Sequence, residues 1–385
     1  MHETRILISG AGIAGFTLAY WLKQRGFSPV IVEKHPNLRE GGYKVDVRGT
    51  ALEVAKRMGI YQDLKDANVN IENSKFVTPS LKVLELDGDI LGHCSEGDIE
   101  VNRWDLTQIL SRATGEIEII YDDSITKIDE LVHFEKSEPR KFDLVIGADG
   151  QYSNVRRHVF GDDSKFLRKY GIHFCVFPIS NIINLNRSEL VYFEKGKFVA
   201  AYAINNHSYG CLAFKSNEET LPLKKTFEDK FKDLDWEIHP FTSAMNASND
   251  CYINSIAQVR MPSWSKGNVA LVGDAAHAAS AMGTSLSMVG AYVLAREIED
   301  ANGDYSAAFD RYERSLKTFV QEAQDLADSN HQLLADGDSS FKITLQLYLM
   351  KLMPKKFIQH ITKKGREEMR RVANGFELEP QVEEN

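Results

Sequence analysis

The hydrophobic pattern at the start of the chain predicts a strand, a helix and a second strand. Residues 5–9 form a short apolar run, and apolar positions at helical spacing follow from 14 to 22. After Gly26 and Pro29, residues 30–32 form a second apolar run that ends on a glutamate. Two buried strands joined by a helix are typical of a βαβ unit. The fold therefore opens with a parallel sheet.

The middle of the chain predicts a second region of a different kind. Residues 75–93 alternate between apolar and polar positions, and longer alternating segments separated by turn residues run from 166 to 262. Alternation of this kind is typical of antiparallel strands that bury one face. Residues 142–146 form another buried run, so the parallel sheet continues between these two stretches.

The C-terminal part is predicted to be helical. Helical spacing extends from 306 to 334 and, after an Asp-Gly-Asp break, from 341 to 372. Pro354 should kink or split the second helix because proline removes a backbone donor. An apolar stripe lies on this second helix, and such stripes are also typical of ordinary core-facing helices. The stripe consists of Phe341, Leu345, Tyr348, Leu349 and Leu352.

Composition and charge exclude several classes of protein. The 385 residues are 43% hydrophobic and 26% charged, which is ordinary for a globular chain. A net charge of -9 argues against nucleic acid as a partner, since phosphate backbones require a basic face. No apolar run is long enough to span a membrane, and the first residues do not form a signal peptide, so we expect a cytoplasmic protein. Four scattered cysteines without a CxxC pair predict free thiols and no metal site.

A glycine motif lies between the first strand and the first helix. Gly10, Gly12 and Gly15 have the GxGxxG spacing, with Ala14 before the last glycine. Glycine at these positions permits a tight turn, close approach to a pyrophosphate and close packing of helix on strand. Glu33, followed by Lys34, ends the second strand, where an acidic side chain accepts hydrogen bonds from an adenosine ribose and disfavours the 2′-phosphate of NADP. FAD and NAD both remain candidates on this motif.

Two further segments place an aspartate beside a glycine at the end of a predicted strand. Asp149 and Gly150 follow the buried run at 142–146, and Gly273 and Asp274 follow the run at 269–272. Ligands of open α/β sheets bind outside the carboxyl ends of the strands. Taken alone, the first segment is equally consistent with an ordinary Asp-Gly turn in which Ser153 caps a helix.

In combination, the three motifs resemble the fingerprints of class A flavoprotein monooxygenases of the aromatic-hydroxylase type. The resemblance spans roughly residues 1–300 and implies that FAD is the cofactor. It also implies that Asp274 contacts the ribityl chain and that Asp149 supports the cofactor and its reduction. Arg103, in the segment 101–106, matches an arginine that contacts FAD. NADPH or NADH would reduce the flavin and O2 would react at flavin C4a, so we expect no catalytic side chain.

The implied fold is an α/β architecture: a Rossmann-type FAD-binding domain with an inserted, mainly antiparallel β substrate domain and C-terminal helices. We expect the FAD-binding domain at 1–75, 95–165 and 263–300, substrate-domain strands at 76–94 and the substrate-binding domain at 166–262. The C-terminal helices would occupy 301–385.

The chain departs from this family after its third motif. Residues 278–284 form a shorter loop without the usual proline, and of its usual glycines only Gly283 is retained. The helix that follows would direct its N-terminus, with its positive dipole end, at the flavin. His277 lies in the motif, and we expect a structural role for it because no partner for base catalysis is evident.

The remaining segments resemble the tetracycline-inactivating flavin monooxygenases, or tetracycline destructases. The resemblance rests on residues 40–49, on residues 282–295 and on the long helical C-terminus. It implies hydroxylation of a polycyclic aromatic, most of all tetracycline, by a monomer in which the helix 341–372 gates the pocket. Two alternatives stay open: a hydroxylase of another phenolic or polyketide substrate, and a flavin-bound sequestering protein without turnover. The candidates for the pocket lining in 166–262 are His173, Phe174, Phe177, Phe193, Tyr202 and Phe214.

Overall fold

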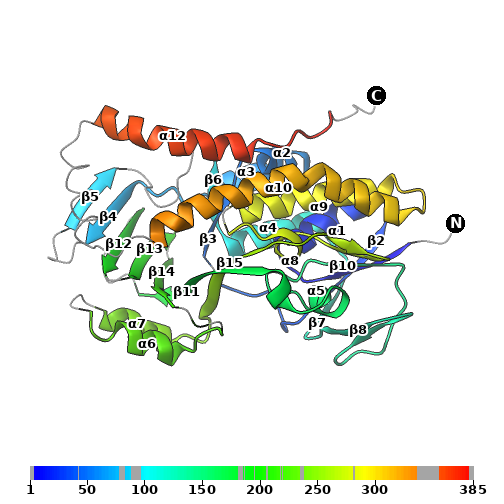
Figure 1. Cartoon of the computed structure of the whole chain (residues 1–385), viewed down its shortest axis with the longest axis horizontal. Helices are drawn as coiled ribbons and strands as arrows, with labels where there is room; N and C mark the ends of the chain where they lie inside the picture. Colours follow the sequence, from blue (N-terminus) through cyan, green and yellow to red (C-terminus); the bar gives the residue numbers. More distant parts are fainter. Residues whose placement is uncertain are drawn as a thin grey trace.

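The computed structural model describes residues 4–41, 43–77, 83–87, 97–180, 185, 187–194, 196–204, 207–216, 218, 220–234, 238–280, 282–335 and 355–380. The predicted fold class is confirmed: helices cover a largely parallel sheet, and a second, mainly antiparallel sheet adjoins it (Figure 1). The domain boundaries given above stay a prediction.

Within these residues, the first sheet has six strands, parallel except for its edge pair. Their order across the sheet is β16 (Ser265–Lys266), β17 (Val269–Leu271), β10 (Leu144–Gly147), β1 (Arg5–Ser9), β2 (Ser28–Glu33) and β7 (Glu118–Tyr121). Ile6, Leu7 and Ile8 of β1 are all fully buried. Such continuous burial is typical of a parallel strand covered on both faces, and it explains the unbroken apolar run in the sequence.

The second sheet has seven strands in the described part of the chain. Their order is β15 (Tyr252–Val259), β11 (Leu167–Ile179), β14 (His207–Lys215), β13 (Lys197–Ile204), β12 (Ser188–Glu194), β4 (Asn73–Val77) and β5 (Val83–Asp87). All neighbours are antiparallel except β12 and β4, which run parallel. Two ribbons complete the strands: β3 (Lys44–Val47) with β6 (Ile99–Asn102), and β8 (Ile125–Ile128) with β9 (Val132–Phe134).

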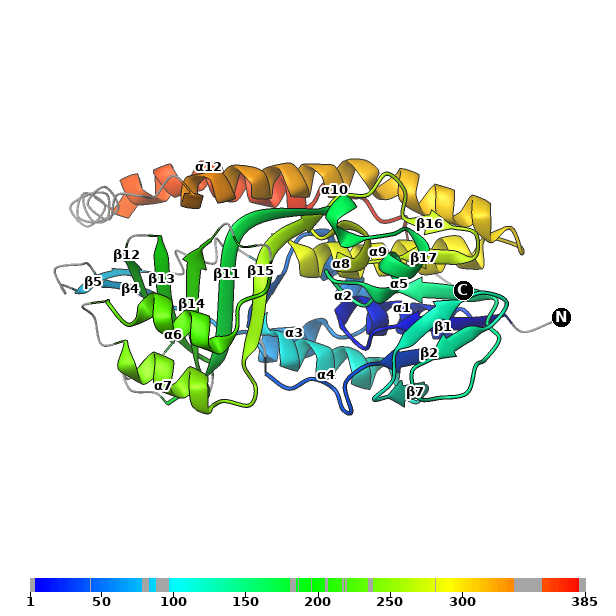
Figure 2. The ribbon, with the colours of Figure 1, turned by 60° about the horizontal axis from the view of Figure 1, so that its bottom comes forward.

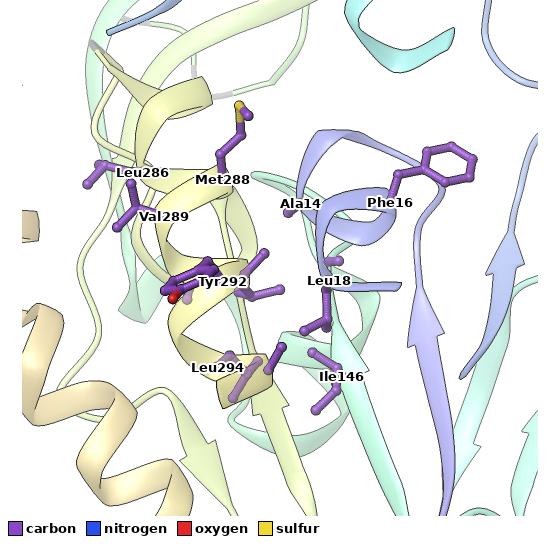
Figure 3. Packing of buried hydrophobic residues seen from close by; sticks show 14 of the residues in the cluster. Ala14, Phe16, Leu18, Ile146, Leu286, Met288, Val289, Tyr292 and Leu294 are labelled. Atoms are coloured by element: carbon purple, nitrogen blue, oxygen red, sulfur yellow. The ribbon is translucent and has the colours of Figure 1, made fainter. Parts of the chain in front are cut away.

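Helices pack on both sheets. The helices associated with the first sheet are α1 (Ile13–Gln24), α2 (Thr50–Arg57), α3 (Tyr61–Asp66), α4 (Arg103–Thr114), α5 (Asn154–Val159), α8 (Asp274–His277) and α9 (Gly283–Glu299), with a 3-10 turn at Asp163–Lys165. Those on the second sheet are α6 (Lys224–Phe231) and α7 (His239–Ala247). Ala14 and Leu18 of α1 lie next to α9 in the main core, beside Ile146 of β10 (Figure 3). This packing fixes the start of α1 and the start of α9 close to the same strand ends.

Two long C-terminal helices lie side by side along the molecule (Figure 2). They are α10 (Tyr305–Ala335), which reaches from the first sheet to the second, and α12 (Lys355–Ala373). Met369, Val372 and Ala373 of α12 are buried in the main core. The predicted apolar stripe at 341–352 lies outside the described residues, as does the break at 336–338.

Candidate functional site

A cavity of about 710 Å³ lies where the carboxyl ends of the parallel strands meet the second sheet. Its walls come from the ends of β1 and β2 and the segment after β10, from β3, from the starts of α1, α4 and α9, and from β11 and β15. The motif residues predicted from sequence that line it are Gly10, Gly12, Ala14, Glu33, Lys34, Arg103, Asp149, Gly150, Asp274 and Gly283. The fold therefore brings three motifs that are more than 100 residues apart in sequence into one site.

The glycine motif forms one end of the cavity, and its three glycines differ in what surrounds them. Gly10 has a φ of +109° and donates its N–H to the Val32 carbonyl at 2.8 Å, which turns the chain from β1 into α1. A Cβ on Gly12 would meet only the Arg103 Nη2 atom, at 3.9 Å, so the backbone there faces open space. Gly15 does not line the cavity; a Cβ there would overlap the Gly10 carbonyl oxygen. Gly15 thus permits the close packing of α1 on β1.

Glu33 is held rigidly at the end of β2. Its Oε2 accepts the Ala11 N–H at 2.8 Å and its Oε1 accepts the His35 N–H at 3.0 Å. The carboxylate therefore connects the second strand to the glycine turn, and Lys34 beside it lines the same end of the cavity.

Asp149 makes the turn and capping contacts considered from sequence, and it also lines the cavity. Its Oδ2 accepts the N–H groups of Asn154 (2.8 Å) and Val155 (3.1 Å), while Ser153 Oγ accepts the Arg156 N–H at 2.9 Å, so the segment does cap α5. Its Oδ1 atom, in contrast, is buried without a hydrogen-bond partner in the described part of the chain. Burial raises the pKa of this carboxyl. A buried acceptor without a donor is costly, so this wall of the cavity suits a ligand that donates.

Asp274 begins α8 and lies close to the start of α9. Burial raises the pKa of its carboxyl, and the charge of Arg103 acts in the opposite direction. A Cβ on Gly283 would lie 3.2 Å from Asp274 Oδ1, so a larger residue there would press on the carboxylate. Asn102 caps α4 by accepting the Trp104 N–H at 2.9 Å, and this places Arg103 in the first turn, facing the cavity.

Three aromatic side chains form a wall where the cavity meets the second sheet. The ring centroids of Tyr43 and Tyr252 are 5.2 Å apart, and Phe174 lies 6.1 Å from Tyr43 and 5.9 Å from Tyr252. Sequence reasoning named Phe174 as a candidate but missed the other two. Tyr43 lies in the Gly-rich segment at 40–49, which was a usable signal, whereas Tyr252 on β15 had none.

Other polar cavity residues were also missed. They include Thr107, Asp123, Gln151, Arg157 and Asn254. Gln151 directly follows the Asp-Gly motif, so its position was readable; the others come together only through the fold. Of the other aromatic candidates, Phe177, Tyr202 and Phe214 are buried in hydrophobic clusters of the second sheet.

His277 lies behind the cavity rather than in its wall. Its ring packs 4.7 Å from that of Trp264, and its Nε2 is 3.4 Å from Tyr312 Oη. Burial lowers the pKa of this imidazole to about 4. The geometry agrees with a packing role for a neutral histidine.

The described residues contain no group of three or more His, Cys, Asp or Glu side chains that could hold a metal ion. No helix among them is long and apolar enough to cross a membrane. Cys175, Cys211 and Cys251 carry free thiols, and Cys94 lies outside the described residues.

Comparison with known proteins identifies the family. A family model described as an FAD binding domain matches residues 3–327. A flavin-dependent monooxygenase from Legionella longbeachae serogroup 1 (strain NSW150) is 36% identical over 337 residues, covering 83% of this chain and 87% of that protein. The crystal structure of tetracycline destructase Tet(51) has a TM-score of 0.85 at 32% identity and covers 98% of this chain and 100% of its own. The crystal structure of tetracycline destructase Tet(55) has a TM-score of 0.83 at 31% identity and covers 99% of this chain and 100% of its own.

The family model spans the motif residues that line the cavity and the relatives span nearly the whole fold, so the chain belongs to the FAD binding domain family and is an FAD-dependent monooxygenase.

Proposed function

We propose that this monooxygenase uses NADPH or NADH and O2 to hydroxylate, and so inactivate, tetracyclines. The observation that carries the proposal is the similarity to two tetracycline destructases, which extends over both sheets and the C-terminal helices rather than over the cofactor-binding motifs alone. The expected cytoplasmic location and monomeric state are part of the same proposal; cell fractionation and size-exclusion chromatography would test them.

The cavity fits FAD on three independent features. The open backbone at Gly12 leaves room for a pyrophosphate at the N-terminus of α1. Glu33 lies at the end of β2, where a ribose would lie, and Asp149 Oδ1 is a buried acceptor without a donor among the described residues. Bound FAD would supply the redox chemistry, taking a hydride from the nicotinamide and passing one oxygen atom of O2 to the substrate.

The residues of this chain would hold and orient the cofactor. We propose that Gly10, Gly12, Ala14, Gly15, Glu33, Lys34, Arg103, Asp149, Gly150, Asp274 and Gly283 form the FAD site. Arg103 partly offsets the cost of a buried Asp274 carboxylate, which would then accept hydrogen bonds from the ribityl chain. The start of α9 would place backbone N–H groups and the positive end of a 17-residue helix near the flavin ring.

The aromatic wall supports a large, planar substrate. Tyr43, Phe174 and Tyr252 come from separate elements and converge on the part of the cavity that borders the second sheet. Aromatic rings prefer offset or edge-to-face contacts with other rings, so this wall suits a fused polycyclic compound. We propose that the helix expected at 341–372, of which α12 is the described part, gates this end of the cavity.

Aerobic NADPH oxidation by the FAD-loaded protein tests the function. The assay is run with and without tetracycline while the near-UV absorbance of the drug is followed, and is repeated with NADH. Loss of both signals together would establish inactivation of tetracycline. NADPH loss without drug loss would redirect the search to other phenolic or polyketide substrates, and loss of neither would favour a sequestering protein.

A further inference from the structure

Residues 278–282 connect α8 to α9, and the described part of this loop has a backbone that its sequence does not favour. Ala278, Ser280, Met282 and Gly283 line the cavity. Ser280 and Met282 have φ values of +60° and +61°, in the left-handed region that residues with a Cβ rarely adopt. Such a conformation persists only where surrounding contacts enforce it.

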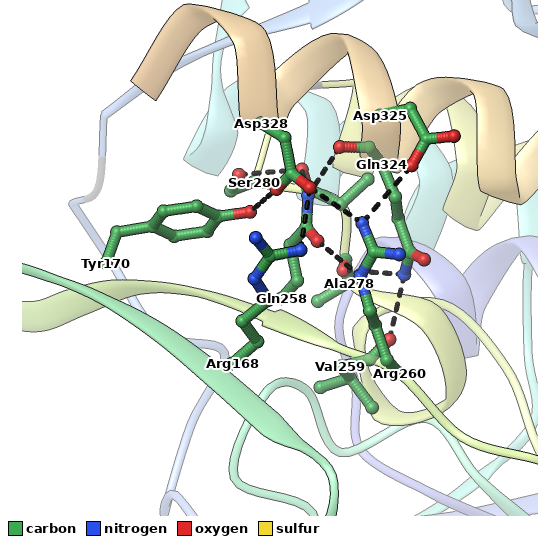
Figure 4. Close-up of polar contacts among 11 residues, drawn as sticks. Arg168, Tyr170, Gln258, Val259, Arg260, Ala278, Ser280, Gln324, Asp325 and Asp328 are labelled. Carbon is green, nitrogen blue, oxygen red and sulfur yellow. Dashed lines mark hydrogen bonds and ion pairs between the residues drawn. The ribbon is translucent and has the colours of Figure 1, made fainter. Parts of the chain in front are cut away.

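Two buried glutamine side chains supply these contacts (Figure 4). Gln324 of α10 donates its Nε2 hydrogens to the carbonyls of Ala278 (3.2 Å) and Val259 (2.9 Å). Gln258 of β15 donates from Nε2 to the Ala279 carbonyl (3.4 Å) and to the backbone carbonyl of Gln324 (2.7 Å). The exposed fractions are 0% for Gln258 and 5% for Gln324, so water does not replace these bonds.

We propose that Gln258 and Gln324, here called the glutamine pair, are positioning residues for the flavin. By fixing the carbonyls of Ala278 and Ala279, the pair holds the loop in the conformation that presents Gly283 beside Asp274 and aims the start of α9 at the cavity. The inference rests on the proposed placement of FAD in this cavity. It explains how a loop that is short and lacks a proline keeps a defined shape.

Hydrogen bonding, rather than packing, is the basis of this role. Ala278 and Ala279 are buried, so their carbonyls need donors. The Ala278 carbonyl accepts the Val259 N–H at 3.0 Å as well as the Gln324 bond, and the Ala279 carbonyl accepts a hydrogen bond from the Ser280 hydroxyl at 2.6 Å as well as the Gln258 bond. Arg260 Nε donates to Gln258 Oε1 at 2.8 Å, which orients that amide toward the loop. Without the glutamine donors each carbonyl would keep a single donor, and the loop would lose its side-chain links to α10 and β15 and relax.

The next turn of α10 offers a matched control. Asp328 accepts a hydrogen bond from Tyr170 Oη and pairs with Arg168 (2.7 Å) and Arg260 (3.1 Å). These contacts join α10 to the second sheet without touching the loop carbonyls. Asp328→Asn keeps an oxygen acceptor for Arg260 Nη2 and leaves the Arg260 Nε bond to Gln258 in place, so it weakens the docking of α10 without removing a donor from the loop.

The test compares Gln324→Met, Gln258→Met and Asp328→Asn with the wild-type protein. Methionine has a similar length and no donor. FAD dissociation constants of the apoproteins are measured by flavin fluorescence, and amide hydrogen exchange is followed in peptides containing Val259 and residues 278–290. We expect FAD binding about tenfold weaker or more, and faster exchange in these peptides, for each methionine variant. Asp328→Asn should stay within about twofold in both readouts.

Two outcomes would overturn the proposal. The first is unchanged FAD affinity and exchange in a folded Gln324→Met protein; the second is an equal loss in Asp328→Asn, which would assign the effect to helix docking. If neither methionine variant folds, amide hydrogen exchange of the wild-type apoprotein decides. A loop held by the glutamine pair is protected from exchange before FAD binds, so an unprotected loop would contradict the proposal. These readouts need no tetracycline, so a wrong substrate assignment would leave the inference standing.

Discussion

Gly12 and Gly15 belong to one motif, yet their surroundings predict opposite consequences of substitution. Gly12→Ala adds a methyl group to the space of the cavity, so the apoprotein should keep its stability while FAD binding weakens by about tenfold or more. Gly15→Ala forces that methyl group into the Gly10 carbonyl, so the apoprotein itself should lose stability, by about 1–3 kcal/mol. Thermal unfolding of both apoproteins and FAD titration separate the two effects.

Gly365, on the exposed face of α12, is the matched control for these substitutions. It has open space around it and helical neighbours, so Gly365→Ala should raise helix stability by about 0.5–1 kcal/mol and leave FAD binding unchanged. A destabilised Gly12→Ala apoprotein would contradict the assignment of Gly12 to ligand space.

His277 predicts a pH dependence of stability. Burial lowers the pKa of its imidazole from 6.5 to about 4, so the unfolded state binds a proton more readily than the folded state between these values. Protonation of His277 therefore does not lower the free energy of unfolding above pH 6.5. As the pH falls from 6.5 toward 4, that free energy decreases by up to about 3 kcal/mol. Denaturant unfolding of wild-type and His277→Gln proteins from pH 7 to pH 4 should show a smaller loss in the variant. Parallel pH curves would show that the histidine does not contribute.

At the scale of elements, the start of α4 connects helix capping to the cofactor site. Asn102 Oδ1 accepts the Trp104 N–H at 2.9 Å, and Arg103 follows in the first turn. Asn102→Ala removes the cap and should cost about 1 kcal/mol of stability while also weakening FAD binding through misplacement of Arg103. Asn102→Ser keeps an acceptor at the cap and should retain most of both properties. Chemical denaturation and FAD titration check this, and equal behaviour of the two variants would argue against a capping role.

Elements with strong local patterns were predictable from the sequence. The pairing of strands that lie far apart in the sequence was not. The buried run at 5–9, the glycine turn and the helix after it all appear as expected, because hydrophobic period and glycine spacing are local properties. The parallel pairing of β4 with β12 was not predictable, since 110 residues or more separate the partners and period-two alternation does not encode direction. Tyr252 enters the cavity only because β15 pairs with β11, which brings it beside Phe174.

At the scale of the whole molecule, one cavity is built from both sheets, and this assembly could be anticipated only in part. The three motifs indicated a single cofactor, and their convergence is seen in the cavity lining. The glutamine pair gave no sequence signal, because Gln258 and Gln324 are isolated polar residues whose importance depends on α10 crossing from one sheet to the other.

The last prediction concerns removal of FAD. Because FAD binds only the folded state, it should stabilise the protein by about 2.7 kcal/mol at one hundred times its dissociation constant, and its removal should lower the unfolding temperature. FMN lacks the adenosine half and one of the two phosphates, so it cannot reach Glu33 or fill the whole pyrophosphate space at Gly12 if the cavity holds the cofactor as proposed. FMN at the same concentration should therefore stabilise the protein much less. Differential scanning calorimetry of the apoprotein with either flavin measures this, and an equal shift with both would show that the glycine end of the cavity does not bind the adenosine half. In that case the Gly12→Ala variant would also bind FAD normally, so the two experiments test the same placement from the side of the ligand and from the side of the protein.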